Sequence, residues 1–281
     1  MLNFRILSLN FHCVPFVSLI SKMLTRELTM KVTLGLGLAA LCLHFATPAI
    51  AKESRTPVLV ELFTSEGCDS CPPANSLLTQ LTTKQPVAGA YVVALGEHVD
   101  YFNTPWVDPF SSSQFTDRQS AFGRVFKLSE IYTPQMVVDG RAEVLGSDVD
   151  AARRAIARAA DARHASVTLS TTPTADAGRI SVRVHVSGVR QTGASKGYLF
   201  VAIAEDGLVS NVKSGENAGK TLTHSGVVRT LVKVRSVTGD AGDYSQTVTL
   251  SPKWNRDNLH AVAFVQDIDT GAIIGTGITN L

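Results

Sequence analysis

The sequence has little cysteine, no surplus of positive charge and no long apolar run. Its 281 residues include only four cysteines, which excludes a disulfide-rich scaffold. After residue 51 the chain holds 22 basic and 23 acidic residues, a balance that does not predict a phosphate-binding surface. The apolar run at residues 34–46 has 13 residues, whereas a membrane-spanning helix needs about 20. We therefore expect no nucleic-acid partner and, in the mature protein, no membrane span.

The apolar run is instead typical of a secretory signal peptide. A short basic region begins at Met30, and residues 48–51 end in the small-x-small pattern of a signal peptidase site. We expect cleavage after Ala51, with an uncleaved anchor as the alternative. Residues 1–51 are then a signal peptide with a mis-annotated upstream start, the true start being Met30 or Met23. The mature protein is expected to be periplasmic or secreted.

Two cysteines remain after that cleavage, Cys68 and Cys71, and they lie between a predicted strand at residues 58–63 and a predicted helix at about residues 73–84. A Cys-x-x-Cys pair at a helix N-terminus is typical of a redox-active dithiol, because the helix dipole favours a thiolate. Cys68 would attack and Cys71 would resolve the mixed disulfide. Asp69 would raise the pKa of Cys68, so we do not expect a strongly oxidising pair. The alternative is an inert disulfide that staples the turn.

The predicted order of elements in the first half is strand, helix, strand, helix, strand, strand, helix. With the cysteine pair at the first turn and Thr133-Pro134 before the third strand, residues 56–163 resemble the thioredoxin superfamily. The resemblance implies that Pro134 is cis and that Thr133 offers its backbone to a substrate. It also implies that Glu61 accepts a proton from Cys71. An ordinary trans proline and a hydrogen-bonded or solvated glutamate are the alternatives.

From about residue 166 the pattern changes to short runs that alternate apolar and polar residues, separated by Gly, Asp, Ser and Thr. This predicts an all-β region of about seven strands, most simply a sandwich. The expected fold class is an α/β thioredoxin-like domain, residues 52–164, followed by an all-β sandwich-like domain, residues 165–281.

Motifs in both halves carry a closer resemblance. They are VELFTSEGCDSCPP at residues 60–73, HVDY at 98–101, YTPQMVVDG at 132–140, GENAGKTL-x-H at 215–224 and VVR at 227–229. Together they resemble the exported proteins of the "domain of unknown function" family numbered 1223, over nearly the whole mature chain. That resemblance implies a thioredoxin-like fold and supplies no substrate.

His98 ends the second predicted strand, at an edge where sites of parallel sheets gather. With Asp100 it could bind a metal ion or shuttle protons, although a lone histidine is more often structural. Cys68, Cys71 and His98 together would suit copper(I). A closed zinc site is less favoured, because a second cysteine pair is missing.

Two further segments have open interpretations. Residues 100–113 resemble an insertion that forms a lid or a docking surface, where Tyr101 and Trp106 line a binding face or simply pack the insertion. His224 and the loop at residues 215–219 belong to the β-rich half, where the loop is a turn or a contact between domains.

The sequence favours a periplasmic or secreted thiol–disulfide oxidoreductase that needs no cofactor. Its partner would be a protein thiol or disulfide in the cell envelope. One alternative is a copper-binding or carrier protein that uses the same cysteines and His98. Another is a non-catalytic binding module with a staple disulfide.

Overall fold

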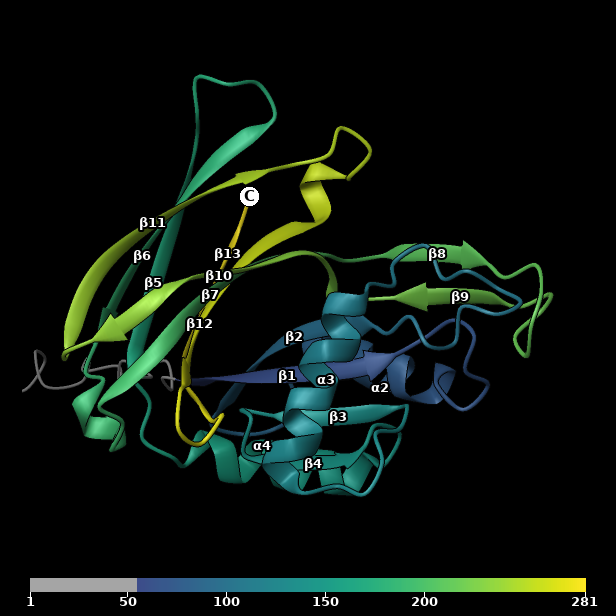
Figure 1. Cartoon of the computed structure of the whole chain (residues 1–281), viewed down its shortest axis with the longest axis horizontal. Helices are drawn as coiled ribbons and strands as arrows, with labels where there is room; N and C mark the ends of the chain where they lie inside the picture. Colours follow the sequence, from purple (N-terminus) through teal and green to yellow (C-terminus); the bar gives the residue numbers. More distant parts are fainter. Residues whose placement is uncertain (1–54) are drawn as a thin grey trace, which may run out of the picture. The chain divides into compact units, whose positions relative to one another are not determined.

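The sheet that organises the chain has eight strands in the order β13-β12-β7-β10-β2-β1-β3-β4 (Figure 1). The structure, a computed structural model, describes residues 55–281, and the predicted signal peptide with its start lies outside them. The first half contains β1 (Thr56–Thr64), α2 (Pro72–Lys84), β2 (Ala90–His98), α3 (Ser113–Phe126), β3 (Gln135–Val138), β4 (Ala142–Leu145) and α4 (Val149–Ala160).

The second half contains strands and two short 3₁₀ turns. They are β5 (Ser166–Pro173), β6 (Arg179–Ser187), η1 (Arg190–Thr192), β7 (Lys196–Glu205), β8 (Leu208–Asn211), β9 (Thr221–His224), β10 (Val227–Thr238), β11 (Ala241–Thr249), η2 (Arg256–Asn258), β12 (Leu259–Asp267) and β13 (Ile273–Asn280). Strands β11, β6 and β5 form a second sheet, and β8 pairs with β9 as a separate hairpin. None of the helices within residues 55–281 is long and apolar enough to cross a membrane.

The predicted fold class, an α/β thioredoxin-like domain followed by an all-β sandwich-like domain, is wrong. The described residues are mostly β, with three α-helices, and strands from both halves share the eight-stranded sheet. The halves join where Val227 of β10 pairs with Gly96 of β2. The predicted boundary between residues 164 and 165 falls in the turn between α4 and β5.

Glycines make that junction possible. A Cβ on Gly226 would lie 2.8 Å from the carbonyl oxygen of Ala94, and the φ of Gly226 is +65°. The Gly96 amide donates to the Gly226 carbonyl over 2.7 Å. Because a bulkier residue would hold the two backbones apart, these positions let β10 extend the sheet beyond β2. Such a pairing leaves no periodic signal in the local sequence.

Strand β1 is buried on both faces, as a central strand should be. Val58, Val60 and Leu62 pack in the core formed with α2 and α4, whereas Leu59 and Phe63 point to the opposite face. That opposite face packs against Phe115 and Phe122 of α3. Alternate residues of β1 therefore face different helices, which decides where each polar side chain of the strand can act.

Candidate functional site

Cys68 and Cys71 form a disulfide, with their Cα atoms 5.5 Å apart. Cys71 is the N-cap of α2, and its carbonyl accepts the amides of Ala74 and Asn75. Cys71 is fully buried, and Cys68 is 2% exposed. Asp69 and Ser70 between them are exposed. Any reagent that reaches the disulfide must therefore come from the side of Cys68.

The start of α2 follows from its sequence. Pro72 and Pro73 occupy the first turn, where a missing backbone donor costs nothing. In helix α2, all of whose residues are described, the first turn carries no acidic side chain. The dipole of α2 therefore favours negative charge on a sulfur at the N-terminus of the helix, with no acidic side chain in the first turn to oppose it.

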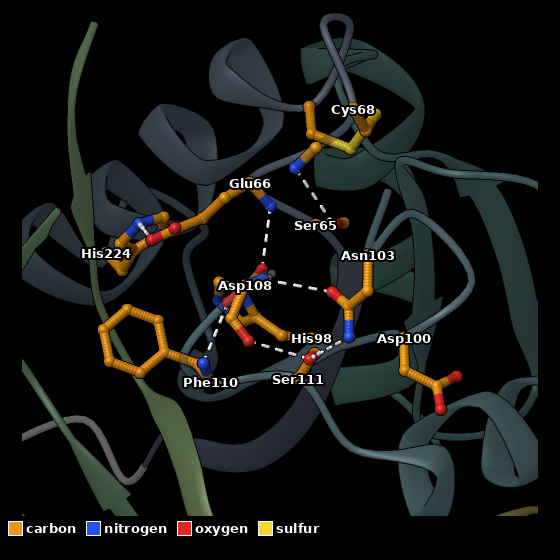
Figure 2. Close-up of polar contacts among 12 residues, drawn as sticks. Ser65, Glu66, Cys68, His98, Asp100, Asn103, Asp108, Phe110, Ser111 and His224 are labelled. Atoms are coloured by element: carbon orange, nitrogen blue, oxygen red, sulfur yellow. Dashed lines mark hydrogen bonds and ion pairs between the residues drawn. A yellow bond between two sulfur atoms is a disulfide. The ribbon is translucent and has the colours of Figure 1, made fainter. Parts of the chain in front are cut away.

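Glu66, two residues before Cys68, is completely buried. Figure 2 shows its contacts with His224 and Asp108. Its carboxylate accepts the Nε1–H of Trp106 at 2.8 Å and lies 3.1 Å from Nε2 of His224. Its amide donates to Asp108 over 2.8 Å. Glu66 thus connects the cysteine turn, through hydrogen bonds, to the segment 100–113 and to strand β9.

A second imidazole–carboxylate pair lies beside this one. His98 Nδ1 is 2.7 Å from Asp108 Oδ2, and both side chains are buried. The His98 and His224 rings meet edge to face with centroids 5.0 Å apart, and Phe110 lies against both rings. We call Glu66, His98, Trp106, Asp108 and His224 the Glu66 cluster.

Burial acts on the titrating groups of the Glu66 cluster in different directions. Burial alone would raise the pKa of Asp108, but His98 and the amides of Glu66 and Phe110 hold that pKa below its usual value. Burial lowers the pKa of His224, and the hydrogen bond to Glu66 offsets this only in part. His224 is therefore neutral at pH 7 and donates its Nε2–H to Glu66.

The second half of the chain also reaches the cysteine turn. Asn217 is fully buried, and its Nδ2 donates to the carbonyls of Glu66 at 2.9 Å and Cys68 at 2.8 Å. The Glu216 carboxylate accepts the Asp69 amide at 3.3 Å. The loop at residues 215–219 fits both interpretations: the Ala218 amide donates to the Gly215 carbonyl within a turn, and the loop also makes a contact between the halves.

Thr133 and Pro134 precede β3 and are joined by a cis peptide bond. The carbonyl of Pro134 accepts the Gly146 amide at 2.9 Å. A Cβ on Gly146 would lie 3.0 Å from Pro134 Cβ and 3.1 Å from Ala74 Cβ, so the proline lies near the first turn of α2. A second cis bond, between Thr104 and Pro105, had no signal in the sequence.

Glu61 lies on the face of β1 that is away from α2. Its carboxylate pairs with Nε of Arg118 on α3, at 2.5 Å, and the guanidinium is 3.5 Å from Glu97 of β2. Burial, and then the charge of Glu61, raise the pKa of Glu97 well above its usual value. Because residues of a strand alternate between faces, Glu61 is directed toward α3, and we do not carry forward its predicted role as proton acceptor for Cys71. We call Glu61, Glu97 and Arg118 the Arg118 cluster.

The metal alternative has no support in the geometry. Across residues 55–281, no three His, Cys, Asp or Glu side chains are grouped so that they could hold a metal ion. His98 is paired with Asp108, whereas Asp100, named above as a residue that could act with His98, accepts the hydroxyl of Thr116 at 2.6 Å. Trp106 bonds to Glu66 and so packs the 100–113 segment onto the cysteine turn.

Sequence reasoning missed Glu66, Asp108 and Asn217 as members of the site. Glu66 and Asn217 lie inside the two motifs that carried the family resemblance, GCDSCPP with its preceding residues and GENAG. The presence of both motifs in one chain was the available signal that their residues act together. The sequence gives no local signal, because Glu66 and His224 are separated by 158 positions. Asp108, in the segment 100–113, had no such signal.

The fold and the site together define a class of protein. It is mostly β, with a disulfide at a helix N-terminus and a buried cluster of imidazole and carboxylate groups. The family model for a protein of unknown function (DUF1223) matches residues 59–266, and the chain belongs to that family. This confirms the family resemblance but does not confirm its thioredoxin-like part. No curated protein matches the sequence.

Two solved structures are similar. A protein from Agrobacterium tumefaciens, determined by a structural genomics consortium, is 26% identical with a TM-score of 0.61, over 80% of this chain and 94% of its own. HBP35 of Porphyromonas gingivalis is 15% identical with a TM-score of 0.56, over 81% of this chain and 76% of its own. The second similarity is one of fold alone.

Proposed function

We propose that the protein exchanges thiols and disulfides with a protein partner in the cell envelope, through Cys68. The observation that carries this proposal is the Cys68–Cys71 disulfide at the N-terminus of α2, with Cys68 next to exposed residues and Cys71 behind it. Export to the periplasm or the outside is part of the proposal, because a lone disulfide persists in an oxidising compartment.

The exchange has two balanced steps. A thiolate of the partner attacks Sγ of Cys68, the Cys68–Cys71 bond breaks, and Cys71 leaves as a thiolate. A second thiolate of the partner then attacks the partner's sulfur in the mixed disulfide and releases Cys68. The partner loses two electrons and gains a disulfide, and the cysteine pair gains two electrons. The reverse sequence reduces a partner disulfide.

The start of α2 supports these steps in a specific way. The thiolate that leaves is Cys71, the N-cap residue, where the dipole of α2 stabilises negative charge. The acidic residue nearest the pair, Asp69, has an exposed side chain, so water and salt screen its repulsion of a thiolate.

A trapping experiment tests the proposal. In Cys71→Ser the mixed disulfide at Cys68 cannot be resolved, so we expect adducts with envelope proteins on non-reducing gels that disappear with reductant. The control is the double variant Cys68→Ser/Cys71→Ser, which forms none. Absence of adducts from the single variant, with folded protein in the envelope, would contradict the exchange function.

The burial of both sulfurs favours a second candidate, a non-catalytic binding module in which the disulfide staples the turn. Closing so short a loop stabilises a fold by about 2 kcal/mol in the chain-entropy model. Under this candidate the double variant loses about that much free energy of unfolding, and Cys71→Ser traps nothing. The trapping result therefore separates the two functions.

A further inference from the structure

The loop between β8 and β9, residues 212–220, contacts the turn that carries Cys68. Its Asn217 is fully buried and donates through one nitrogen to two carbonyls of that turn, those of Glu66 and Cys68. Lys220 Nζ donates to Asn217 Oδ1 over 2.8 Å, which fixes the orientation of the amide. A buried side-chain amide with all of these partners holds a defined position.

The same loop makes a second, exposed contact with the turn and a third with the segment 100–113. The Glu216 carboxylate accepts the amide of Asp69, the residue between the cysteines. The Ser214 hydroxyl donates to the carbonyl of Pro105 at 3.3 Å. The loop thus bonds to both of the segments that surround Cys68, although it comes from the other half of the chain.

We propose that this loop is a latch, with Asn217 as its positioning residue, that controls access of thiols to Cys68. The inference rests on the proposed exchange function and adds its regulation. Attack on a disulfide needs an open approach to the sulfur that is attacked, and only 2% of Cys68 is exposed. Release of the Asn217 and Glu216 contacts frees the turn to present Cys68 to a partner.

The contacts also determine how the latch is released. The Glu216 contact joins an exposed carboxylate to a backbone amide, so it opens at little cost. The Asn217 contacts are buried, and breaking them leaves two carbonyls and an amide without partners until water enters. Asn217 is therefore the member that sets the closed population.

The test measures the rate at which dithiothreitol reduces the disulfide in the folded, oxidised protein. We expect Asn217→Ala to be reduced about tenfold faster, because two hydrogen bonds of ordinary net strength are lost. Glu216→Ala, an exposed change that does not threaten folding, should be about threefold faster. The matched control is Asn211→Ala, which loses a bond to Thr221 Oγ1 in the same hairpin but makes no contact with the cysteine turn.

The outcomes are decisive in both directions. Faster reduction of Asn217→Ala and Glu216→Ala, with Asn211→Ala unchanged, supports the latch. Equal rates for the parent, Asn217→Ala and Glu216→Ala overturn it, and so does an equal acceleration by Asn211→Ala, which would show general loosening of the hairpin. If Asn217→Ala does not fold, Glu216→Ala against Asn211→Ala decides. A small thiol reports on access without a partner protein, so failure of the latch is distinct from failure of the trapping experiment.

Discussion

The Glu66 cluster and the Arg118 cluster both place ionisable side chains inside the protein, and they are built in different ways. In the Glu66 cluster, both carboxylate oxygens of Glu66 have a partner, Trp106 or His224. In the Arg118 cluster, among the described residues, both oxygens of Glu97, one of Glu61 and Nη2 of Arg118 have no hydrogen-bond partner. Within residues 55–281, the Glu66 cluster leaves one buried atom without a partner, Nδ1 of His224, whereas the Arg118 cluster leaves these four and relies on ion pairing.

The clusters also differ in what they connect. The Glu66 cluster joins the cysteine turn, the segment 100–113 and β9, which are segments around a candidate reactive site. The Arg118 cluster joins β1, β2 and α3, and the rings of Phe122, Phe200 and Phe264 lie 5.0 to 5.3 Å from its guanidinium. We infer that the Glu66 cluster positions the site and that the Arg118 cluster stabilises the packing of β1, β2 and α3.

The largest effect is expected in the Arg118 cluster. Arg118→Met leaves the carboxylate of Glu61 buried without its cation, so we expect a loss of about 3–5 kcal/mol in the free energy of unfolding, measured in urea. Arg124→Met, at an exposed position of the same helix, is the control and should change little. A loss below about 1 kcal/mol for Arg118→Met would show that the pair is not structural.

Glu66→Gln gives a smaller loss of stability and a different additional effect. The neutral amide keeps one acceptor oxygen but places its NH2 group opposite one of the two donors, Trp106 or His224, so we expect a loss of about 2 kcal/mol. Because the Glu66 side chain holds the turn whose carbonyls accept from Asn217, weaker side-chain contacts should loosen that turn and speed reduction of the disulfide by dithiothreitol. Glu61→Gln is the comparison: it should destabilise the fold without speeding that reaction. Equal acceleration by both would remove the distinction between the clusters.

Features that depend on residues close together in the sequence were predictable, and features that depend on distant residues were not. The predicted element order has two successive strands where β3 and β4 lie, and these strands pair antiparallel. Asp139-Gly140 between them is a hairpin turn signal that depends on adjacent residues alone. The shared sheet was not predicted, since the pairing of Gly96 with Val227 depends on a chain reversal far along the sequence. The cysteine pair at a strand–helix turn was predictable for the same local reason as the hairpin.

Within the site, residue type was a weaker guide than strand alternation. Glu61 is a carboxylate in the strand that precedes the cysteines, and the thioredoxin resemblance implies its role from that position. The alternation of β1 directs it toward α3, while Glu66, beyond the strand's end, is free to turn toward β9. Partners 158 positions apart, such as Glu66 and His224, cannot be paired from one sequence without structural information.

The two clusters should give stability opposite dependences on pH. The pKa of Glu97 is raised by burial and by Glu61, so the native state keeps a proton that the unfolded chain loses above about pH 4.5. Stability therefore falls as pH rises from there toward the native pKa, by at most about 1.4 kcal/mol per pH unit. Glu97→Gln, which cannot ionise, should remove this fall in unfolding curves measured between pH 4.5 and 7.5. An unchanged slope would contradict the assignment.

The smallest effect is the opposite slope from His224. Burial lowers its pKa, so the unfolded chain binds a proton below about pH 6.5 that the native state resists. The stability that this neutral imidazole contributes is present above pH 6.5 and is lost as pH falls toward its native pKa. His224→Gln keeps a donor for Glu66 without titrating, so the difference from the parent should shrink as pH falls. His185→Gln, at an exposed pair with Asp243, is the control and should leave the slope as it is. A parent whose stability rises on acidification through this range would mean that the imidazole is charged, and that Glu66 is held by an ion pair like that of Arg118.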